Sequence, residues 1–510
     1  MSVWRTKSIE QSLADAETPE FQLKRRLTAV DLTVFGIGVI IGAGIFTLTG
    51  RAAAQYAGPG VVFSFVIAAI CCGLAALCYA EFASTVPVSG SAYTFSYATL
   101  GEMLAWIIGW DLILEMVLGA SVVAQGWSSY LVTFLEEIGL GWPEGFGPDA
   151  NAEFGQPNLA ALLLVVVLVG LITIGIKESL RVNLALVAVK LFIVLFVIVA
   201  GMFYISGSNY EPFVPERAGS ISGEGIHQPL IQWAFGLEPQ TFGVLGIISA
   251  ASVVFFAYIG FDVVATTAEE AKNPQRDLPR GIIGSLVICT ILYVAVALVI
   301  TGMVRYDQID PDAALATAFR DVGRGGFATL ISAGAVAGLT TVVMTLMIGA
   351  IRVVFAMSRD GLFPVKFAHV NPKTGTPVRI TLTIGVFVAI VATFTPIGKL
   401  EEMVNIGTLT AFALVSIAVP ILRKRRPDLQ RSFSVPLNPV LPIVAALICI
   451  YLTLNLSVET WLRFIIWLGI GFGIYFAYSQ QRSRIGQPGY MDVSLPHVVS
   501  HVHEEDDDKS

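Results

Sequence analysis

The sequence is poor in charged residues, which occupy 14% of its 510 positions, whereas hydrophobic residues occupy 55%. Soluble domains carry charges at about 25% of their positions. Because the mean hydropathy is also +0.74, the composition excludes an ordinary soluble protein and indicates an integral membrane protein. The formal net charge of −7 is small and gives no indication of a nucleic-acid partner.

Cysteine and histidine are also scarce, with five residues of each type. The cysteines lie inside apolar segments without the paired spacing of a metal or redox site, and every histidine lies in an expected loop or in the tail. We therefore expect no metal, no cofactor and no disulfide, and any proton relay within the membrane has to use lysine or carboxylates. Because a glycine-rich phosphate loop and a nucleophile paired with an intramembrane histidine are also missing, an enzyme is not expected.

Apolar runs of about 20 residues recur along the chain and predict about twelve transmembrane helices. The third and eighth runs are longer than a bilayer is thick, which predicts tilt or extension into water. The runs begin near Leu32, Pro59, Leu104, Leu159, Leu184, Ile247, Ile282, Ala328, Ile380, Met403, Leu437 and Trp461.

Lysine and arginine are concentrated in alternate connections between these runs. If the N-terminus is cytoplasmic, most of them fall on the cytoplasmic side, so the positive-inside rule places both termini there. We expect a cytoplasmic N-terminal segment over residues 1–29, a transmembrane domain over 30–479 and a disordered cytoplasmic tail over 480–510. The polar start does not have the pattern of a cleavable signal peptide.

The first apolar run contains four glycines within Gly36–Phe46. Each glycine costs a helix roughly 1 kcal/mol relative to alanine, so a regular helix is unfavourable near Gly42, Ala43 and Gly44. A break inside the membrane exposes backbone groups that lipid cannot satisfy, so it must line a cavity or face protein. Close packing through a GxxxG pair of Gly38 and Gly42 is the alternative explanation.

An odd number of helices in each of two repeats would place the second repeat upside down in the membrane. We expect one repeat over about residues 30–206, a second over about 247–422, and two further helices over about 437–479. The sixth helix then corresponds to the first, and a glycine and Asp262 interrupt its apolar sequence within Phe255–Asp262. A second break is predicted there, and two matching breaks favour a solute site over packing alone.

Helix breaks of this kind suit a zwitterion. Free N–H groups that begin a half-helix carry partial positive charge and favour a carboxylate, whereas carbonyls that end a half-helix favour an ammonium group. The predicted substrate-binding residues are Ile41, Gly42, Ala43, Gly44 and Ile45 in the first break, and Phe256, Ala257, Tyr258 and Ile259 in the second. An α-amino acid carries both charged groups and is the predicted substrate.

Four motifs follow one another in the chain, namely Gly36–Phe46, Phe256–Asp262, Ala268–Pro279 and Ala356–Pro364. Together they resemble the amino acid/polyamine/organocation (APC) superfamily, and more narrowly its bacterial cationic amino acid transporters, over about residues 20–480. The resemblance implies an all-α, leucine-transporter-like membrane fold of two inverted five-helix repeats plus two helices. It also implies amino acid uptake, usually coupled to protons. Relatives often carry Thr or Ser at the position of Ala43, so a hydroxyl contact to the substrate carboxylate would be missing here.

Lys190 is a basic residue deep within the fifth apolar run. One explanation is that its side chain snorkels to the cytoplasmic interface. The other is proton coupling, because burial disfavours the charged ammonium and makes release of its proton easier. By resemblance, the ammonium would replace the cation that sodium-coupled relatives hold beside the fifth helix.

Asp111 and Glu115 are four residues apart and face the same way on the third helix. With Lys190 they leave an excess of negative charge, which protonation or a cationic substrate side chain would relieve. Glu115 is the first candidate for side-chain selectivity, and hydrogen bonds to neighbouring helices are its alternative role. Asp262 could support the site, or it could cap the second half of the sixth helix.

The combined prediction is a plasma-membrane transporter that imports an amino acid with a proton by alternating access. Its partners are the substrate, protons and the lipid bilayer. Glu115 favours a cationic substrate, whereas Met344 and Met347 on the eighth helix favour a small neutral one, so the side chain stays open. A polyamine or amino acid exchanger of the same fold is the close alternative. An ion channel is a more distant one, because it would need a symmetric filter. The sequence gives neither stoichiometry nor oligomeric state.

Overall fold

The computed structural model describes residue 5 and residues 27–85, 92–143, 145–147, 156–175, 180–218, 225–237, 239, 241–265, 267–311, 313–371, 374–429 and 431–486. The predicted N-terminal segment and the predicted tail fall largely outside these residues. Within the described ranges, every regular element is helical, which confirms the all-α class.

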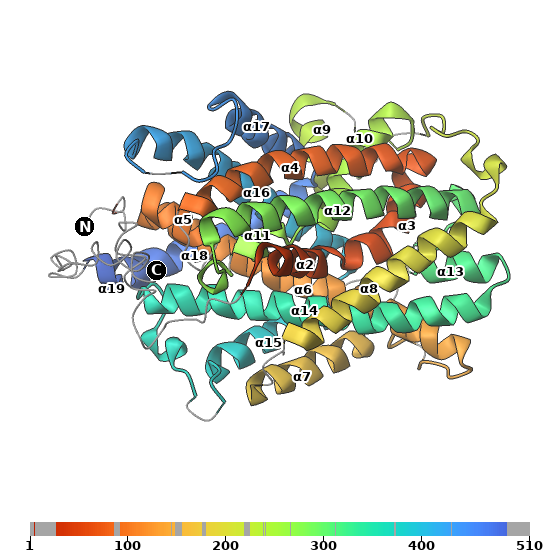
Figure 1. Cartoon of the computed structure of the whole chain (residues 1–510), viewed down its shortest axis with the longest axis horizontal. Helices are drawn as coiled ribbons and strands as arrows, with labels where there is room; N and C mark the ends of the chain where they lie inside the picture. Colours follow the sequence, from red (N-terminus) through yellow and green to blue (C-terminus); the bar gives the residue numbers. More distant parts are fainter. Residues whose placement is uncertain are drawn as a thin grey trace, which may run out of the picture.

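The helices follow the order of the predicted apolar runs (Figure 1). The first predicted repeat contains α2 (Ala29–Ile40), η1 (Gly44–Leu48), α3 (Thr49–Ala52), η2 (Ala53–Ala57), η3 (Gly58–Gly60), α4 (Val61–Thr85), α5 (Ala92–Thr99), α6 (Glu102–Glu137), α7 (Leu159–Ile174), α8 (Leu180–Gly201) and η4 (Met202–Tyr204). The connection to the second contains η5 (Gly207–Tyr210), η6 (Gly225–His227) and α9 (Leu230–Phe235). The second contains α10 (Gly243–Val254), η7 (Phe255–Tyr258), α11 (Phe261–Ala265), η8 (Ala268–Glu270), α12 (Pro274–Met303), η9 (Tyr306–Gln308), α13 (Ala314–Asp321), α14 (Gly325–Arg359), η10 (Val365–Ala368), α15 (Val378–Phe394) and α16 (Ile397–Arg425). The chain continues with α17 (Val440–Leu454), α18 (Val458–Ile474), η11 (Tyr475–Ser479), α19 (Gln480–Arg482) and η12 (Arg484–Gly486).

Side-chain caps fix where several helices begin. Thr28 and Asp31 form a reciprocal capping box at the start of α2, in which the Thr28 N–H donates to Asp31 Oδ2 at 2.9 Å. Asn158 caps α7 by accepting from the Ala161 N–H at 3.1 Å. Such caps satisfy N–H groups that have no partner within the helix, so the apolar segments begin at defined residues.

Eight helical stretches among the described residues are long and apolar enough to cross a membrane by length and composition. Shorter apolar helices stand at the remaining predicted runs: α2, α7, α15 and α17. The count of about twelve membrane-crossing helices therefore stays a prediction, although an apolar helix occupies every predicted run.

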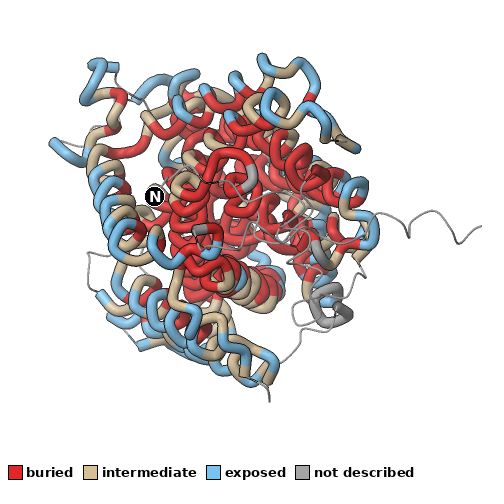
Figure 2. Tube along the Cα trace, turned by 90° about the vertical axis from the view of Figure 1, so that its left-hand side faces the viewer, coloured by how far each residue is buried: buried red, intermediate tan, exposed pale blue. Residues whose placement is uncertain are grey.

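The two longest helices are α6 and α14, with 36 and 35 residues. At 1.5 Å per residue each is more than about 50 Å long, compared with ~30 Å for the hydrocarbon layer. This confirms the prediction that the third and eighth helices exceed a bilayer. The two pack along each other, and buried residues fill the centre of the molecule in the end-on view while exposed ones lie outside (Figure 2).

The helices that correspond under the predicted repeat also contact one another: α4 packs on α12, α6 on α14, and η1 on η7. A two-fold axis between the repeats would produce these pairings. The inverted repeat and its boundaries stay a prediction.

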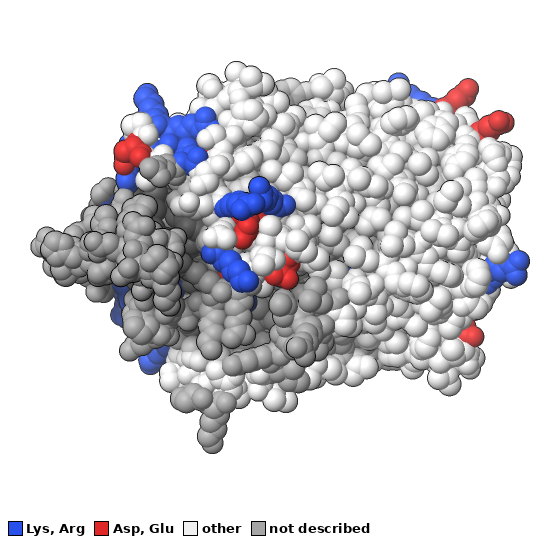
Figure 3. Space-filling view, in the orientation of Figure 1, with Lys and Arg blue, Asp and Glu red and all other residues white. Residues whose placement is uncertain are grey.

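Charged side chains lie towards the two ends of the face shown in Figure 3 and leave a wide uncharged band between them. This is the distribution expected when a lipid bilayer surrounds the middle of a protein.

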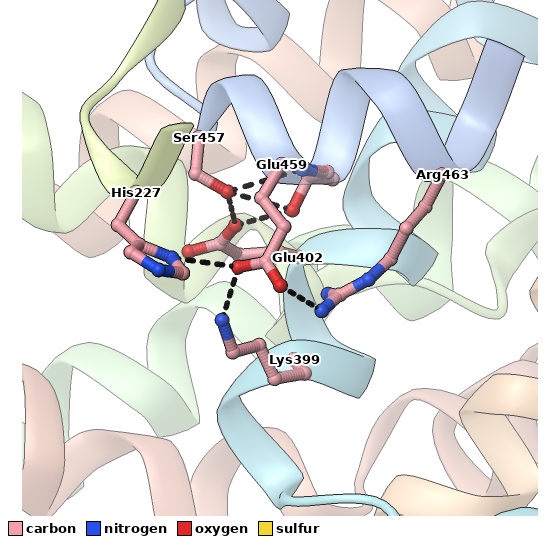
Figure 4. A network of polar contacts seen from close by, with 7 residues as sticks. His227, Lys399, Glu402, Ser457, Glu459 and Arg463 are labelled. Atoms are coloured by element: carbon pink, nitrogen blue, oxygen red, sulfur yellow. Dashed lines mark hydrogen bonds and ion pairs between the residues drawn. The ribbon is translucent and has the colours of Figure 1, made fainter. Parts of the chain in front are cut away.

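A polar network joins the connection after η4 to the first turns of α16 and α18 (Figure 4). The Glu459 carboxylate lies 2.9 Å from His227 Nδ1 and also pairs with Lys399 and Arg463. Backbone hydrogen bonds support the same contact, since the Leu230 N–H donates to the Leu456 carbonyl at 2.9 Å. The network holds this long connection against the helix ends.

Candidate functional site

The first helix is interrupted over Ile41–Gly44, here called the first break, and the chain turns at Ile41 and Gly42. Helix α2 ends at Ile40, and Ile41 has ψ of 88°, which turns the chain away from the helix axis. Ala43 is already helical, with φ −54° and ψ −27°, and η1 follows from Gly44. The predicted break is confirmed. The turn at Ile41 and Gly42 lies just before the centre of the predicted stretch at Ala43, because alanine tolerates the helical backbone better than glycine does.

The second break covers Phe255–Gly260 in the sixth helix. Helix α10 gives way to the tight turn η7, after which Ile259 is extended with ψ of 139°. Gly260 then has φ of +117°, a backbone conformation that only glycine adopts without strain. The predicted break in the sixth helix is confirmed.

The two breaks are in direct contact. A Cβ atom added to Gly44 would lie 2.3 Å from the Ala257 Cα, so a side chain here would push the breaks apart. A Cβ added to Gly42 would meet a Val342 methyl group of α14 at 3.2 Å. The glycines therefore serve close packing, and that packing brings together the two backbone segments predicted to hold a solute.

Tyr293 on α12 connects the ends of both first half-helices. Its hydroxyl hydrogen is shared between the Ile40 carbonyl oxygen at 2.7 Å and the Ala257 carbonyl oxygen at 2.8 Å. A carbonyl at a helix end has no partner in its own helix, so the tyrosine satisfies groups that the breaks would leave unpaired. Sequence reasoning missed this residue because its partners are distant in the chain.

Further side chains fix the backbone on either side of the breaks. The Tyr130 hydroxyl donates to the Phe46 carbonyl at 2.6 Å, just after the first break. The Asn405 amide donates to the Ser252 carbonyl at 3.1 Å, just before the second. Tyr258, a predicted site residue, is fully buried and donates its hydroxyl to Phe65 of α4.

Lys190 lies beside the first break. Its side chain is 1% exposed, and Nζ donates to the Gly38 carbonyl at 2.5 Å. The snorkelling explanation is therefore wrong: the ammonium group points into the protein and binds α2. Gly338 on α14 makes this possible, because a Cβ there would lie 2.7 Å from Lys190 Cγ.

Asp111 and Glu115 are both buried and both face α16, as their spacing predicts. A Cβ on Gly407 would lie 2.8 Å from Asp111 Oδ1, and Thr408 neighbours the Glu115 carboxyl. Both Asp111 oxygens and Glu115 Oε2 have no hydrogen-bond partner within the described part of the chain. Tyr79 on α4 is buried as well, and its hydroxyl has no hydrogen-bond partner among the described residues.

Asp262 lies at the start of α11 and is fully buried. Backbone groups of Gly260 and Val263 lie beside its carboxyl group. Asp262 is the second residue of α11 and does not precede the helix, so the predicted capping role stays a prediction. The Asp262 carboxyl group lies within electrostatic range of the Glu115 carboxyl group. The residue thus belongs to the same acidic region as the carboxyls of α6.

A sequence profile described as amino acid permease matches residues 27–475. The chain belongs to the amino acid permease family, within the APC superfamily. This permease is 46% identical over 490 residues to the branched-chain amino acid permease BcaP of Bacillus subtilis (strain 168), covering 95% of this chain and 99% of that protein.

Other relatives carry different names. The permease is 43% identical over 490 residues to the methylthioribose transporter of Bacillus subtilis (strain 168), covering 95% of this chain and 100% of that protein. It is 40% identical over 436 residues to the vacuolar cationic amino acid transporter 2 of Arabidopsis thaliana, covering 84% of this chain and 64% of that protein. The predicted resemblance to the superfamily is confirmed, and the relatives include both branched-chain and cationic transporters.

In this permease most residues of both breaks are buried. The residues predicted to bind the substrate or to couple protons are buried, and only Ile259 among them is partly exposed. On the side of α3, Arg51 forms an ion pair with Glu401 of α16 at 2.8 Å. The described residues contain no group of three or more side chains that could hold a metal ion. At the site two half-helices end and a third begins: α2 ends at Ile40, η1 begins at Gly44 and η7 ends at Tyr258.

Proposed function

We propose that the protein is a secondary active transporter of the plasma membrane that imports an amino acid by alternating access. The observation that carries the proposal is the direct contact between the two helix breaks, through Gly44 and Ala257. N–H groups following Ile41 complement a substrate carboxylate, and carbonyls near Phe256 to Ile259 complement its ammonium group. Both termini are cytoplasmic in this proposal.

The proposed substrate is a neutral amino acid with an aliphatic side chain. The name of the Bacillus relative supports this choice, as does Val342, whose methyl groups face the first break. The buried Met347 adds apolar volume in the same helix. In this proposal Glu115 serves the protein and not a cationic substrate side chain.

Uptake is proposed to be coupled to protons through Lys190. The ammonium group satisfies the Gly38 carbonyl at the first break, so loss of its proton would weaken a contact that holds α2 in place. Asp111 and Asp262 support the acidic region beside the second break. Proton binding and movement of the broken helices would in this way be linked.

The test is uptake by the purified protein in proteoliposomes with and without an inward proton gradient. The panel comprises labelled leucine, isoleucine, valine, alanine, arginine, lysine, putrescine and methylthioribose. Gradient-driven accumulation of leucine, isoleucine and valine is expected. Uptake of putrescine without any amino acid would overturn the proposal, and uptake that requires an amino acid inside the liposomes would indicate an exchanger.

Methylthioribose is the second candidate substrate, because a relative of 43% identity bears that name. A sugar has no carboxylate or ammonium group for the two breaks to bind. If methylthioribose alone is accumulated, recognition must come from side chains and not from the half-helix ends.

A further inference from the structure

A basic cavity lies at the end of the molecule where α14 ends and α15 begins. It has a volume of about 520 Å³ and is open on one side. It is bounded by the last turn of α14, by η10, by the first turn of α15 and by η12. Most of the surface that lines it is apolar, and five basic residues stand around it: Arg359, Lys366, His369, Arg379 and Arg484.

Hydrogen bonds and close packing hold the residues after α18 at this cavity. The Arg484 N–H donates to the Asp360 carbonyl at 3.1 Å, and Ser479 Oγ donates to the Leu362 carbonyl at 2.7 Å. Gly361 packs so closely on Arg482 that a Cβ there would lie 2.5 Å from its carbonyl oxygen. Arg484 is therefore a built part of the cavity wall, brought there from more than a hundred residues away in the sequence.

The charge of the cavity is of one sign. None of the residues that line it, all of them within the described chain, is acidic. Arg379 is held at the wall, because Nη1 donates to the Lys366 carbonyl at 3.3 Å. Lys366, Arg379 and Arg484 are exposed cations around one cavity and repel each other, and an anion between them would offset that repulsion. Arginine forks bind phosphate oxygens in pairs, so a phosphate group is the best match.

Helix α15, whose first turn lines the cavity, presents a surface suited to acyl chains. After Arg379, helix α15 presents Leu382, Val386 and Ile390 at helical spacing, and all three are exposed. Val365, at the cavity itself, is 58% exposed. A phosphate in the cavity could therefore continue into hydrocarbon along α15, as a phospholipid does at the membrane interface.

We propose that this cavity binds a phosphate-bearing anion, supplied either by the headgroup of an anionic phospholipid or by a soluble phosphate compound. The apolar face of α15 favours the headgroup. Occupancy joins η12 to the ends of α14 and α15 and stabilises that end of the protein. The site is separate from the helix breaks, and its existence does not depend on which solute is transported.

The experiment measures thermal unfolding of the purified full chain in detergent with added phosphatidylglycerol, phosphatidylcholine or inorganic phosphate. The test variant is Arg379→Gln with Arg484→Gln. The matched control is Arg276→Gln with Arg280→Gln, which removes two exposed charges at the start of α12. Phosphatidylglycerol should stabilise the wild type and the control, and it should bind the test variant about fivefold more weakly for each charge removed, since an interfacial basic residue contributes ~1 kcal/mol.

The outcomes distinguish a lipid headgroup from a soluble phosphate, and both of these from the absence of an anion site. Stabilisation by phosphatidylglycerol but not by inorganic phosphate supports the headgroup, and stabilisation by both supports a site for free phosphate as well. Equal stabilisation of wild type and test variant overturns the proposal, as does an equal effect of phosphatidylcholine on the wild type. If the test variant does not fold, Arg379→Lys with Arg484→Lys keeps the charges and should keep phosphatidylglycerol binding. Phosphatidylglycerol binding to the wild type should weaken as salt is added, and binding that does not depend on salt would contradict the proposal.

Discussion

Gly44 is the residue where helix packing and the proposed substrate site depend on the same atoms. Its missing side chain lets the two breaks touch, with Ala257 only 2.3 Å from where a Cβ would stand. The first stretch alone left packing and solute binding as alternatives, and the matching break in the sixth helix favoured a solute site. In the structure the contact that requires glycine also brings the two sets of backbone groups together, and solute binding there stays a prediction.

Replacing Gly44 with alanine should therefore abolish uptake and lower stability. Overpacking of a buried contact costs about 1–3 kcal/mol, which should appear as a lower apparent Tm in detergent. Gly170→Ala is the control, because a Cβ at Gly170 on α7 meets nothing within 4 Å and alanine favours a helix. Normal leucine uptake by Gly44→Ala would show that the contact is dispensable.

Lys190 carries a prediction that distinguishes proton coupling from structural support. Lys190→Met removes the donor to the Gly38 carbonyl and should cost about 1.5–3 kcal/mol. It should also end the response of uptake to a proton gradient, while exchange of internal for external substrate continues. Both activities are measured in proteoliposomes.

Lys190→Arg is the discriminating variant, since arginine donates a hydrogen bond but does not release its proton. If the ammonium only holds α2, the arginine variant should regain gradient-driven uptake. An unchanged gradient response in Lys190→Met would remove the proton-coupling role altogether.

The broken helices show which features a local pattern can predict. Glycine destabilises the helical turn in which it stands, so the positions of Gly42 and Gly260 in the sequence were enough to predict the breaks without the fold. The partners of the broken backbone could not be found this way. Tyr293 and Gly338 are ordinary residues of apolar helices, and only the packing of α12 and α14 on α2 brings them to the site.

Tyr293→Phe tests whether α12 holds the two breaks in place. Losing the hydroxyl leaves the Ile40 and Ala257 carbonyls without this donor, at a cost of about 1–3 kcal/mol. We expect a lower apparent Tm and a raised KM for leucine uptake.

Tyr210→Phe is the matched control, because Tyr210 donates to Leu298, also on α12 but away from the breaks. It should change the apparent Tm without changing KM. The same KM shift in both variants would mean that the effect comes from α12 as a whole and not from the bridge between breaks.

At the scale of the molecule, the lengths of the apolar runs predicted where the helices lie in the sequence, because a bilayer fixes how long an apolar segment must be. Their arrangement was beyond this reasoning, since a helix that is apolar on all sides does not show which neighbour it prefers. The packing of α6 on α14 and the contact of His227 with Glu459 join residues far apart in the chain. Such contacts come from the fold as a whole.

The orientation of the whole molecule is open to a direct test, because all five cysteines are free and buried. A membrane-impermeant maleimide should therefore label the wild type weakly. Ser208 lies in the connection after η4, and Ser432 lies between α16 and α17; both are exposed. In intact cells, Ser208→Cys should be labelled and Ser432→Cys should not, until the membrane is made permeable. The reverse pattern would place both termini outside, and it would turn the basic cavity at the end of α14 away from the cytoplasm.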